Sequence, residues 1–220
     1  MGGSAAAAAA GAAGAAGAAV GVLGLQGSFA LHVGALERLG LPARLVKKPD
    51  DLEGVRHLIL PGGESTVISH FLESTGLGER IARRVRDGGL ACLGTCAGAI
   101  ILGREPEGGE TGAGRQPRRL GLADVELRRN AYGRQRESFR RTIRLEDDLA
   151  TGGGEATEVE GVFIRSPRIV RVGAAARVLG RDGDEPVLVR DGACLLATFH
   201  PELAGGAGAL RVHAYFVERL

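Results

Sequence analysis

Cys96 lies in the segment Gly94-Thr95-Cys96-Ala97-Gly98, where one apolar run ends and a second begins. A cysteine flanked by small residues at a strand-to-helix turn is the thiol counterpart of a nucleophile elbow, because glycines allow the sharp turn that exposes the side chain. Unpaired N–H groups at the start of a helix stabilise a thiolate, the reactive form of cysteine. We therefore predict that Cys96 is a nucleophile. Cys92 and Cys194 fall inside predicted strands and are expected to be core residues.

His200 and Glu202 are the two further groups that a thiol nucleophile needs. A histidine can take up and return a proton, and a carboxylate can orient the ring. His200 ends a predicted apolar strand, where open α/β sheets place their active sites, and an extended backbone would put His200 and Glu202 on one side of the chain. The other histidines have no suggestive carboxylate near them in sequence and are expected to be structural: His32, His57, His70 and His213.

The segment Pro61-Gly62-Gly63-Glu64-Ser65-Thr66 joins a predicted strand to a helix that Ser65 or Thr66 can cap. It lacks the Gly-Lys-Ser/Thr of a phosphate-binding loop. Glycine N–H groups beside a nucleophile suit an oxyanion hole, where one donor lowers the barrier by about 3 kcal/mol in a comparable acyl-transfer enzyme. The segment is therefore expected to hold a developing oxyanion.

Strand-like and helix-like patterns alternate through the first half of the chain, which implies a parallel sheet covered on both faces. Short strand-like stretches and Asp-Gly turns dominate the second half and indicate hairpins. The predicted fold is α/β and three-layered, with a mostly parallel central sheet flanked by helices and a small antiparallel addition in the second half. In the first half, strands are expected at 20–25, 43–46, 57–60 and 90–93, and helices at 29–39, from 65 and at 77–86.

Length and composition favour one globular domain. The chain has 220 residues, is 44% hydrophobic and carries a formal net charge of +2, which suits one sizeable core. Residues 1–19 contain only Met, Gly, Ser and Ala, without the charges of a secretory or mitochondrial leader and without enough hydrophobicity for a membrane span. We expect a low-complexity extension at 1–19, disordered or upstream of the true start, and a single domain at 20–220.

The cysteine count and the charge pattern exclude several partners. Three cysteines are too few and too odd in number for a disulfide framework, and no zinc spacing is present, so we expect no metal and a reducing, cytoplasmic setting. Residues 115–144 contain ten arginines against three acidic residues. The chain as a whole is nearly neutral and carries no nucleic-acid-binding motif, so this segment is expected to be a solvated or partner-facing surface.

These motifs together resemble a known family. The Cys96 elbow with a distant His-Pro-Glu is typical of the class I (triad) glutamine amidotransferases. Further segments make the chain similar to the glutaminase subunits of pyridoxal 5'-phosphate synthase, from about Val20 to the C-terminus. Those segments are Leu23-Gly24-Leu25-Gln26-Gly27, Pro61–Thr66, Arg129-Asn130-Ala131-Tyr132-Gly133-Arg134-Gln135, Phe163-Ile164-Arg165-Ser166-Pro167 and Phe199-His200-Pro201-Glu202-Leu203.

The resemblance implies a flavodoxin-like fold of the class I amidotransferase type and assigns roles to individual residues. Cys96, His200 and Glu202 would form the catalytic triad, and the N–H groups of Gly63 and Ala97 would form the oxyanion hole. An arginine suits the α-carboxylate of L-glutamine, because its planar guanidinium can donate two parallel hydrogen bonds. The residues expected to contact glutamine are Gly63, Glu64, Ser65, Arg129, Ile164 and Arg165.

The resemblance also implies a partner. Glutamine would be hydrolysed to glutamate and ammonia without a metal or organic cofactor. The ammonia would pass to a synthase (lyase) subunit, in a large hetero-oligomer, that makes pyridoxal phosphate from ribose 5-phosphate and glyceraldehyde 3-phosphate. Two features depart from the family pattern, namely the extension at 1–19 and a loop at 104–118 that is longer than usual.

Three alternatives remain open at this point. The chain could be the glutaminase of another amidotransferase, such as imidazole glycerol phosphate synthase, although the Arg129–Gln135 and Phe163–Pro167 segments would then be unexplained. A cysteine peptidase or stress protein of similar fold would leave the His-Pro-Glu unexplained. A catalytically silent regulatory binding module would not need all three triad residues.

Overall fold

The computed structural model describes residues 19–110, 116–129, 131, 138–146, 158–205, 208 and 210–220. The predicted N-terminal extension, except for Ala19, lies outside these residues. The same holds for residues 111–115 of the 104–118 loop and for most of the Arg129–Gln135 segment. Within the described residues, no helix combines the length and the hydrophobicity needed to cross a membrane.

A run of parallel strands forms one half of the central sheet. Its spatial order is β2-β1-β3-β4-β11, and every neighbouring pair in this half is parallel. All but the edge strand β2 are almost completely buried, as expected for strands covered on both faces. The bounds are β1 Val20–Leu23, β2 Ala43–Val46, β3 His57–Leu60, β4 Ala91–Thr95 and β11 Cys194–Ala197.

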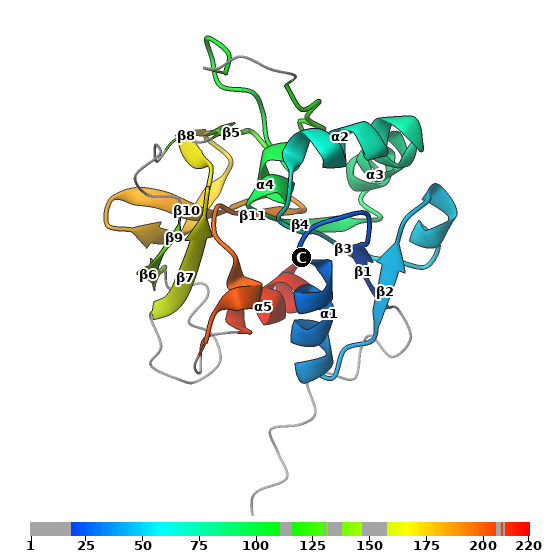
Figure 1. The fold of residues 1–220 in the computed structure, drawn as a ribbon, viewed down its shortest axis with the longest axis horizontal. Helices are drawn as coiled ribbons and strands as arrows, with labels where there is room; N and C mark the ends of the chain where they lie inside the picture. The colour runs from blue at the N-terminus through cyan, green and yellow to red at the C-terminus, as the bar shows by residue number, and fades with distance from the viewer. Residues whose placement is uncertain are drawn as a thin grey trace, which may run out of the picture.

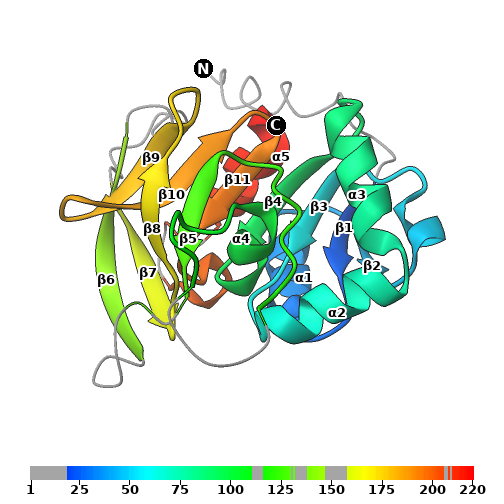
Figure 2. The ribbon, with the colours of Figure 1, turned by 90° about the horizontal axis from the view of Figure 1, so that it is seen from above.

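The antiparallel strands continue the same sheet. Beyond β11 the order is β10-β9-β6-β7, which gives nine strands among the described residues, and β5 pairs with β8 in a separate two-stranded sheet. The predicted α/β class and the antiparallel addition are both confirmed (Figure 2). The bounds are β5 Val125–Arg128, β6 Ser138–Leu145, β7 Glu158–Ile164, β8 Arg168–Val172, β9 Arg177–Asp182 and β10 Glu185–Asp191.

Helices cover both faces of the sheet. In Figure 1, α2, α3 and α4 lie on one face, and α1 and α5 lie side by side on the other. Each face has its own apolar cluster: Ile68, Leu72 and Ile81 belong to the first, and Leu36 and Phe216 to the second. The bounds are α1 Phe29–Arg38, α2 Ser65–Ser74, α3 Leu77–Arg86, α4 Ala97–Leu102 and α5 Arg211–Arg219.

The strand order brings four loops to one edge of the sheet. The chain runs from β1 to β2 on one side and then crosses to β3 on the other, so the direction of winding reverses between β1 and β3. Open α/β sheets bind ligands at the carboxyl ends of their strands beside such a reversal. The turns after β1, β3, β4 and β11 meet there, and they carry Ser28, Gly62, Cys96 and His200.

Candidate active site

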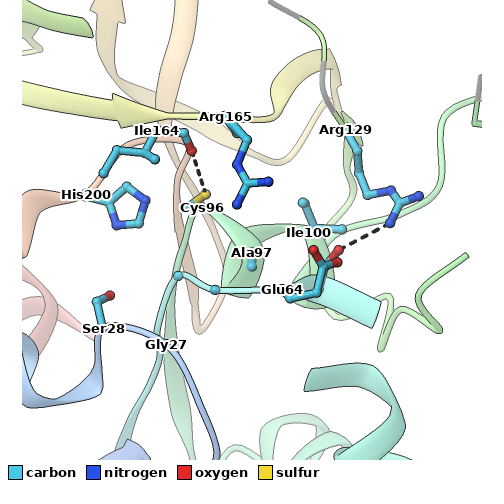
Figure 3. Close-up of a pocket in the computed structure, with 13 residues that line it drawn as sticks. Gly27, Ser28, Glu64, Cys96, Ala97, Ile100, Arg129, Ile164, Arg165 and His200 are labelled. Atoms are coloured by element: carbon cyan, nitrogen blue, oxygen red, sulfur yellow. Dashed lines mark hydrogen bonds between the residues drawn. The ribbon is translucent and has the colours of Figure 1, made fainter. Parts of the chain in front are cut away.

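A cavity of about 280 Å³ lies at this edge of the sheet (Figure 3). Every residue predicted for the site except Glu202 lines it, and Glu202 is buried behind His200. The cavity therefore joins residues from both halves of the chain, which are far apart in sequence. The lining residues are Gly27, Ser28, Gly62, Gly63, Glu64, Ser65, Cys96, Ala97, Ile100, Arg129, Ile164, Arg165 and His200.

Cys96 occupies a strained turn between β4 and α4. Its φ is +47° and its ψ is −103°, in a region that side-chain-bearing residues rarely adopt, and such strain is concentrated at functional sites. A Cβ on Gly98 would lie 1.9 Å from the carbonyl oxygen of Leu60, so only glycine lets α4 pack this closely on β3. The predicted strand–elbow–helix arrangement around Cys96 is therefore present in the structure.

The Cys96 thiol meets the backbone of the antiparallel half. Its Sγ lies 3.8 Å from the carbonyl oxygen of Ile164, to which it donates (Figure 3). The next residue, Arg165, has φ +43°; with Cys96 it makes up the non-glycine residues of positive φ in the described part of the chain. Two turns with positive-φ residues thus meet at the cavity wall. Ile164 contributes its carbonyl group at this point.

His200 and Glu202 are held together by a short turn. His200 lies three residues beyond β11 and precedes a 3₁₀ turn, η3 (Pro201–Leu203). The expected extended backbone between the two side chains is therefore wrong. Pro201 suits the first position of such a turn because its φ is fixed and it needs no N–H partner. The turn brings His200 Nδ1 to 2.8 Å from Glu202 Oε1, which leaves Nε2 for the thiol.

The electrostatics of this pair favour a charged histidine. Burial would lower the pKa of His200, but hydrogen bonds with Cys96 and Glu202 outweigh it and raise the pKa to about 10. Burial would likewise raise the pKa of Glu202, yet His32, His200 and Ser28 lower it to about 2. At neutral pH, Glu202 is an acceptor and His200 can hold a proton beside the sulfur. That arrangement stabilises a thiolate and supplies an acid for a leaving group.

Ser28, which the sequence did not single out, connects the triad to the glycine segment. Its Oγ donates to Glu202 Oε1 at 2.6 Å, and its backbone N–H donates to the carbonyl oxygen of Gly62 at 3.2 Å. Because the peptide is planar and trans, the N–H of Gly63 points away from Ser28. A Cβ on Gly62 would lie 2.3 Å from His200 Cε1, so the ring rests directly on this glycine.

Glu64, and not Ser65 or Thr66, is the N-cap of α2. Its carboxylate accepts from the backbone N–H and the hydroxyl of Thr66, at 3.4 and 3.0 Å. A longer side chain thus does the capping predicted for a hydroxyl residue. This leaves the Ser65 hydroxyl to face the cavity, where Arg129 Nη1 lies 3.5 Å away.

Arg129 directly follows β5 and is oriented by residues of the 104–118 loop. Its Nη2 donates to Gln116 Oε1 at 2.8 Å, and its backbone N–H donates to Glu110 Oε2 at 3.2 Å. The Glu110 carboxylate is almost fully buried and also pairs with Arg119. Glu110 and Gln116 of the 104–118 loop therefore contribute to the position of an arginine in the cavity wall.

The arginine-rich segment is largely neutralised where it is described. Arg118 pairs with Glu73, Arg119 with Glu110 and Arg140 with Glu160, the last at 2.7 Å. Within the described ranges, no cluster of three or more His, Cys, Asp or Glu side chains has the arrangement of a metal site. Cys92, Cys96 and Cys194 are all free.

Comparison with known proteins agrees with this geometry. The model of the SNO glutamine amidotransferase family matches residues 22–220. The chain belongs to this family. The match begins two residues after Val20 and excludes the alanine-glycine extension, and it spans the elbow, the glycine segment and the His-Pro-Glu.

Individual relatives are similar over nearly their whole length. A pyridoxal 5'-phosphate synthase subunit PdxT from Thermus thermophilus is 50% identical over 88% of this chain and 93% of its own. The subunit of the same name from Pelotomaculum thermopropionicum is 44% identical over 89% and 91%. A crystal structure described as a glutamine amidotransferase is 46% identical, with a TM-score of 0.78 over 90% of this chain and 97% of its own.

A more distant structure shares the fold alone. The PurLQS structure from Thermotoga maritima is 18% identical, with a TM-score of 0.65 over 91% of this chain and 97% of that chain.

Taken together, the family match and the relatives confirm the predicted resemblance, fold class and enzyme family. The roles of the individual site residues remain a proposal.

Proposed function

We propose that this chain is the glutaminase subunit of a pyridoxal 5'-phosphate synthase. It hydrolyses L-glutamine and passes the ammonia to a synthase subunit. The observation that carries the proposal is the cavity in which Cys96, at a strained elbow, faces a His200 bonded to Glu202. Family membership and relatives at 44–50% identity that bear this name support it over the glutaminase of another amidotransferase.

The proposed reaction begins with attack of the Cys96 sulfur on the side-chain amide carbon of glutamine. The carbonyl oxygen becomes an oxyanion, which the N–H groups of Gly63 and Ala97 would stabilise. Ala97 is the first residue of α4, so its N–H has no acceptor within the helix. His200 then donates its proton to the amide nitrogen, the C–N bond breaks and ammonia leaves.

Hydrolysis of the thioester completes the cycle. The neutral His200 takes a proton from water, the hydroxide attacks the thioester carbon, and the C–S bond breaks to give glutamate and the Cys96 thiolate. Glu202 keeps His200 Nδ1 protonated throughout, so Nε2 is the nitrogen that exchanges protons with the reacting atoms. These steps use only the residues that line the cavity and the buried Glu202.

The opposite wall of the cavity would recognise the amino acid part of glutamine. Arg129 and Arg165 supply positive charge for the α-carboxylate, and Glu64 supplies negative charge for the α-amino group. The Ser65 hydroxyl and the backbone of Gly63 and Ile164 complete the expected contacts. This division would place the amide end of glutamine at Cys96.

We further propose that the ammonia is transferred inside a large hetero-oligomer with the synthase subunit, in the cytoplasm. Three free cysteines are consistent with a reducing setting. A cavity formed by residues from both halves of the chain suits coverage by a partner, which would keep ammonia from escaping into water.

Co-expression with the cognate synthase subunit tests the proposal. The complex should form pyridoxal phosphate from the two sugar phosphates with either L-glutamine or an ammonium salt as nitrogen source. The Cys96→Ala complex should use the ammonium salt alone. Product formation by the unmodified complex with ammonium but not with glutamine would refute the glutaminase role.

A further inference from the structure

Two buried histidines, His32 and His213, continue the triad into the core. His32 Nε2 lies 3.4 Å from Glu202 Oε2, and His32 Nδ1 lies 2.9 Å from His213 Nε2. Both rings are fully buried. They come from α1 and α5, the two helices that lie side by side on one face of the sheet in Figure 1. His32, which the sequence predicts to be structural, therefore has a carboxylate partner that lies far away in sequence.

The contacts of Glu202 determine which nitrogen of His32 carries a proton. Glu202 Oε1 already accepts from Ser28 and His200, whereas Oε2 has no hydrogen bond of normal geometry among the described residues. A buried carboxylate oxygen needs a donor, and His32 Nε2 is the group that faces it. Thr95 Oγ1, 3.2 Å from the same nitrogen, can share that N–H.

A proton on His32 Nε2 sets the state of His213. If His32 is neutral, its Nδ1 carries a lone pair, so His213 Nε2–H must be the donor across the 2.9 Å contact. His213 Nδ1 is then unprotonated, which agrees with its lack of a hydrogen-bond partner among the described residues. The N–H of His213 consequently points to His32, and the N–H of His32 points to Glu202.

Burial favours two neutral rings. Burial lowers the pKa of His32. The charge on Glu202 raises this pKa, and the charge on His200 lowers it further. Burial also lowers the pKa of His213 to about 3; His32 and Arg38 act in the same direction and Glu202 acts against it. Neither histidine therefore competes with His200 for the proton that the reaction uses.

We propose that His32 and His213 are positioning residues for the triad: His32 donates its Nε2–H to Glu202, and His213 selects the tautomer of His32 that can do so. The proposal rests on the triad proposed above. Without His213, the proton of His32 can move to Nδ1, which turns a lone pair toward the carboxylate. Glu202 would then hold His200 less firmly in the tautomer that the reaction needs.

Glutaminase kinetics of the complex with the synthase subunit test the role of His32. His32→Leu should lower kcat about 10- to 100-fold with little change in KM, as for loss of other residues that orient a reacting group. The acidic limb of the kcat/KM profile should move to higher pH, because Glu202 loses an N–H that would stabilise its ionised form. His32→Gln, which can place an amide N–H near the Nε2 position, should restore most of kcat and the pH profile.

The matched control is His57→Leu, since His57 lies on the same face of the sheet but packs against Phe216 and not Glu202. A His32→Leu variant with the kcat and pH profile of His57→Leu would overturn the proposal. His213→Leu should have an effect in the same direction and smaller than that of His32→Leu.

An NMR measurement on the unmodified protein gives an independent answer even if a variant fails to fold. With ¹⁵N-labelled histidine, His32 should show a protonated Nε2 and a bare Nδ1, and His213 should show the same pattern. A bare His32 Nε2 would overturn the proposal. This readout needs no turnover, so it separates failure of the positioning role from failure of the proposed glutaminase function.

Discussion

The two halves of the sheet contribute different parts of the cavity. The parallel half supplies Cys96, His200 and the Gly62–Gly63 peptide, and the antiparallel strand β7 also holds the first two through the carbonyl oxygens of Ile164 and Val162. The antiparallel half supplies Arg165 and, from the separate β5–β8 sheet, Arg129, which depends on the 104–118 loop for its orientation. The proposed bond-breaking groups therefore lie on the parallel, doubly covered part of the fold. The arginines proposed to bind the substrate carboxylate lie on the antiparallel part, whereas Glu64 and Ser65 come from the parallel half.

This comparison predicts that changes on the two sides have different kinetic signatures. Substitutions in the parallel half should lower kcat, because they alter groups that act on the reacting atoms. Substitutions in the antiparallel half should raise KM, because they alter groups that hold the unreactive end of the substrate.

Replacing the nucleophile should have the largest effect. Cys96→Ala is expected to reduce glutamine turnover by at least about 10⁴-fold, because the thioester cannot form. Cys92→Ala and Cys194→Ala are matched controls, since both cysteines are fully buried in strands and burial raises the pKa of each thiol. Steady-state ammonia release measures all three, and substantial turnover by Cys96→Ala would remove Cys96 from the mechanism.

Gly62→Ala should have the next largest effect. The new Cβ would lie 2.3 Å from His200 Cε1, so either the ring or the oxyanion segment must move. We expect kcat to fall about 10²- to 10³-fold, comparable with the loss of one oxyanion donor. Gly34→Ala is the control, because a Cβ there meets nothing within 4 Å. A kcat within about twofold of the unmodified protein would show that the contact between Gly62 and His200 is unimportant.

Arg129→Lys should act mainly on KM. A lysine keeps the charge but loses the planar pair of donors, and a charged hydrogen bond contributes about 1.5–3 kcal/mol, so KM should rise roughly 10- to 100-fold. Arg118→Lys is the control, because Arg118 makes an exposed ion pair with Glu73 outside the cavity. If kcat falls and KM does not change, the assignment of carboxylate recognition to the antiparallel half is wrong.

The smallest effect concerns stability in acid. His213 has a folded-state pKa of about 3 against an ordinary value of about 6.5, so the unfolded chain binds more protons between these values. Stability should therefore fall as pH drops below about 6.5, by at most about 1.4 kcal/mol per pH unit from this residue. His213→Leu should have a shallower loss of urea stability between pH 7 and 5, whereas exposed His70→Leu should match the unmodified slope.

Much of the fold could be predicted because its signals are local. The strands at 43–46 and 57–60 and the helix at 77–86 have the predicted bounds, since apolar runs and glycine turns mark their ends. The turn at Cys96 between a strand and a helix was also predicted from the local sequence. The β4 strand runs to Thr95 and not to Leu93, because pairing with β11 extends the ladder through Gly94 and Thr95.

The connections behind the site could not be predicted, because they depend on tertiary contacts. Nothing local to Ser28 or His32 indicates Glu202, which lies more than 160 residues away in sequence. The link depends on α1 packing beside the turn after β11. The role of Glu110 could not be predicted for a different reason. A carboxylate in a charged, glycine-rich loop is usually solvated, whereas Glu110 is buried between two arginines.

The position of β11 has a consequence for the order in which the enzyme can assemble. This last strand of the described sheet lies in the middle of it, between β4 and β10, and the turn after it brings His200 and Glu202 to the cavity. During synthesis, β4 cannot pair with β11 until about a hundred further residues have been added to the chain. Such long-range pairing is slow. The thiol of Cys96 therefore remains without its proposed acid–base partner until the chain has been translated beyond Glu202.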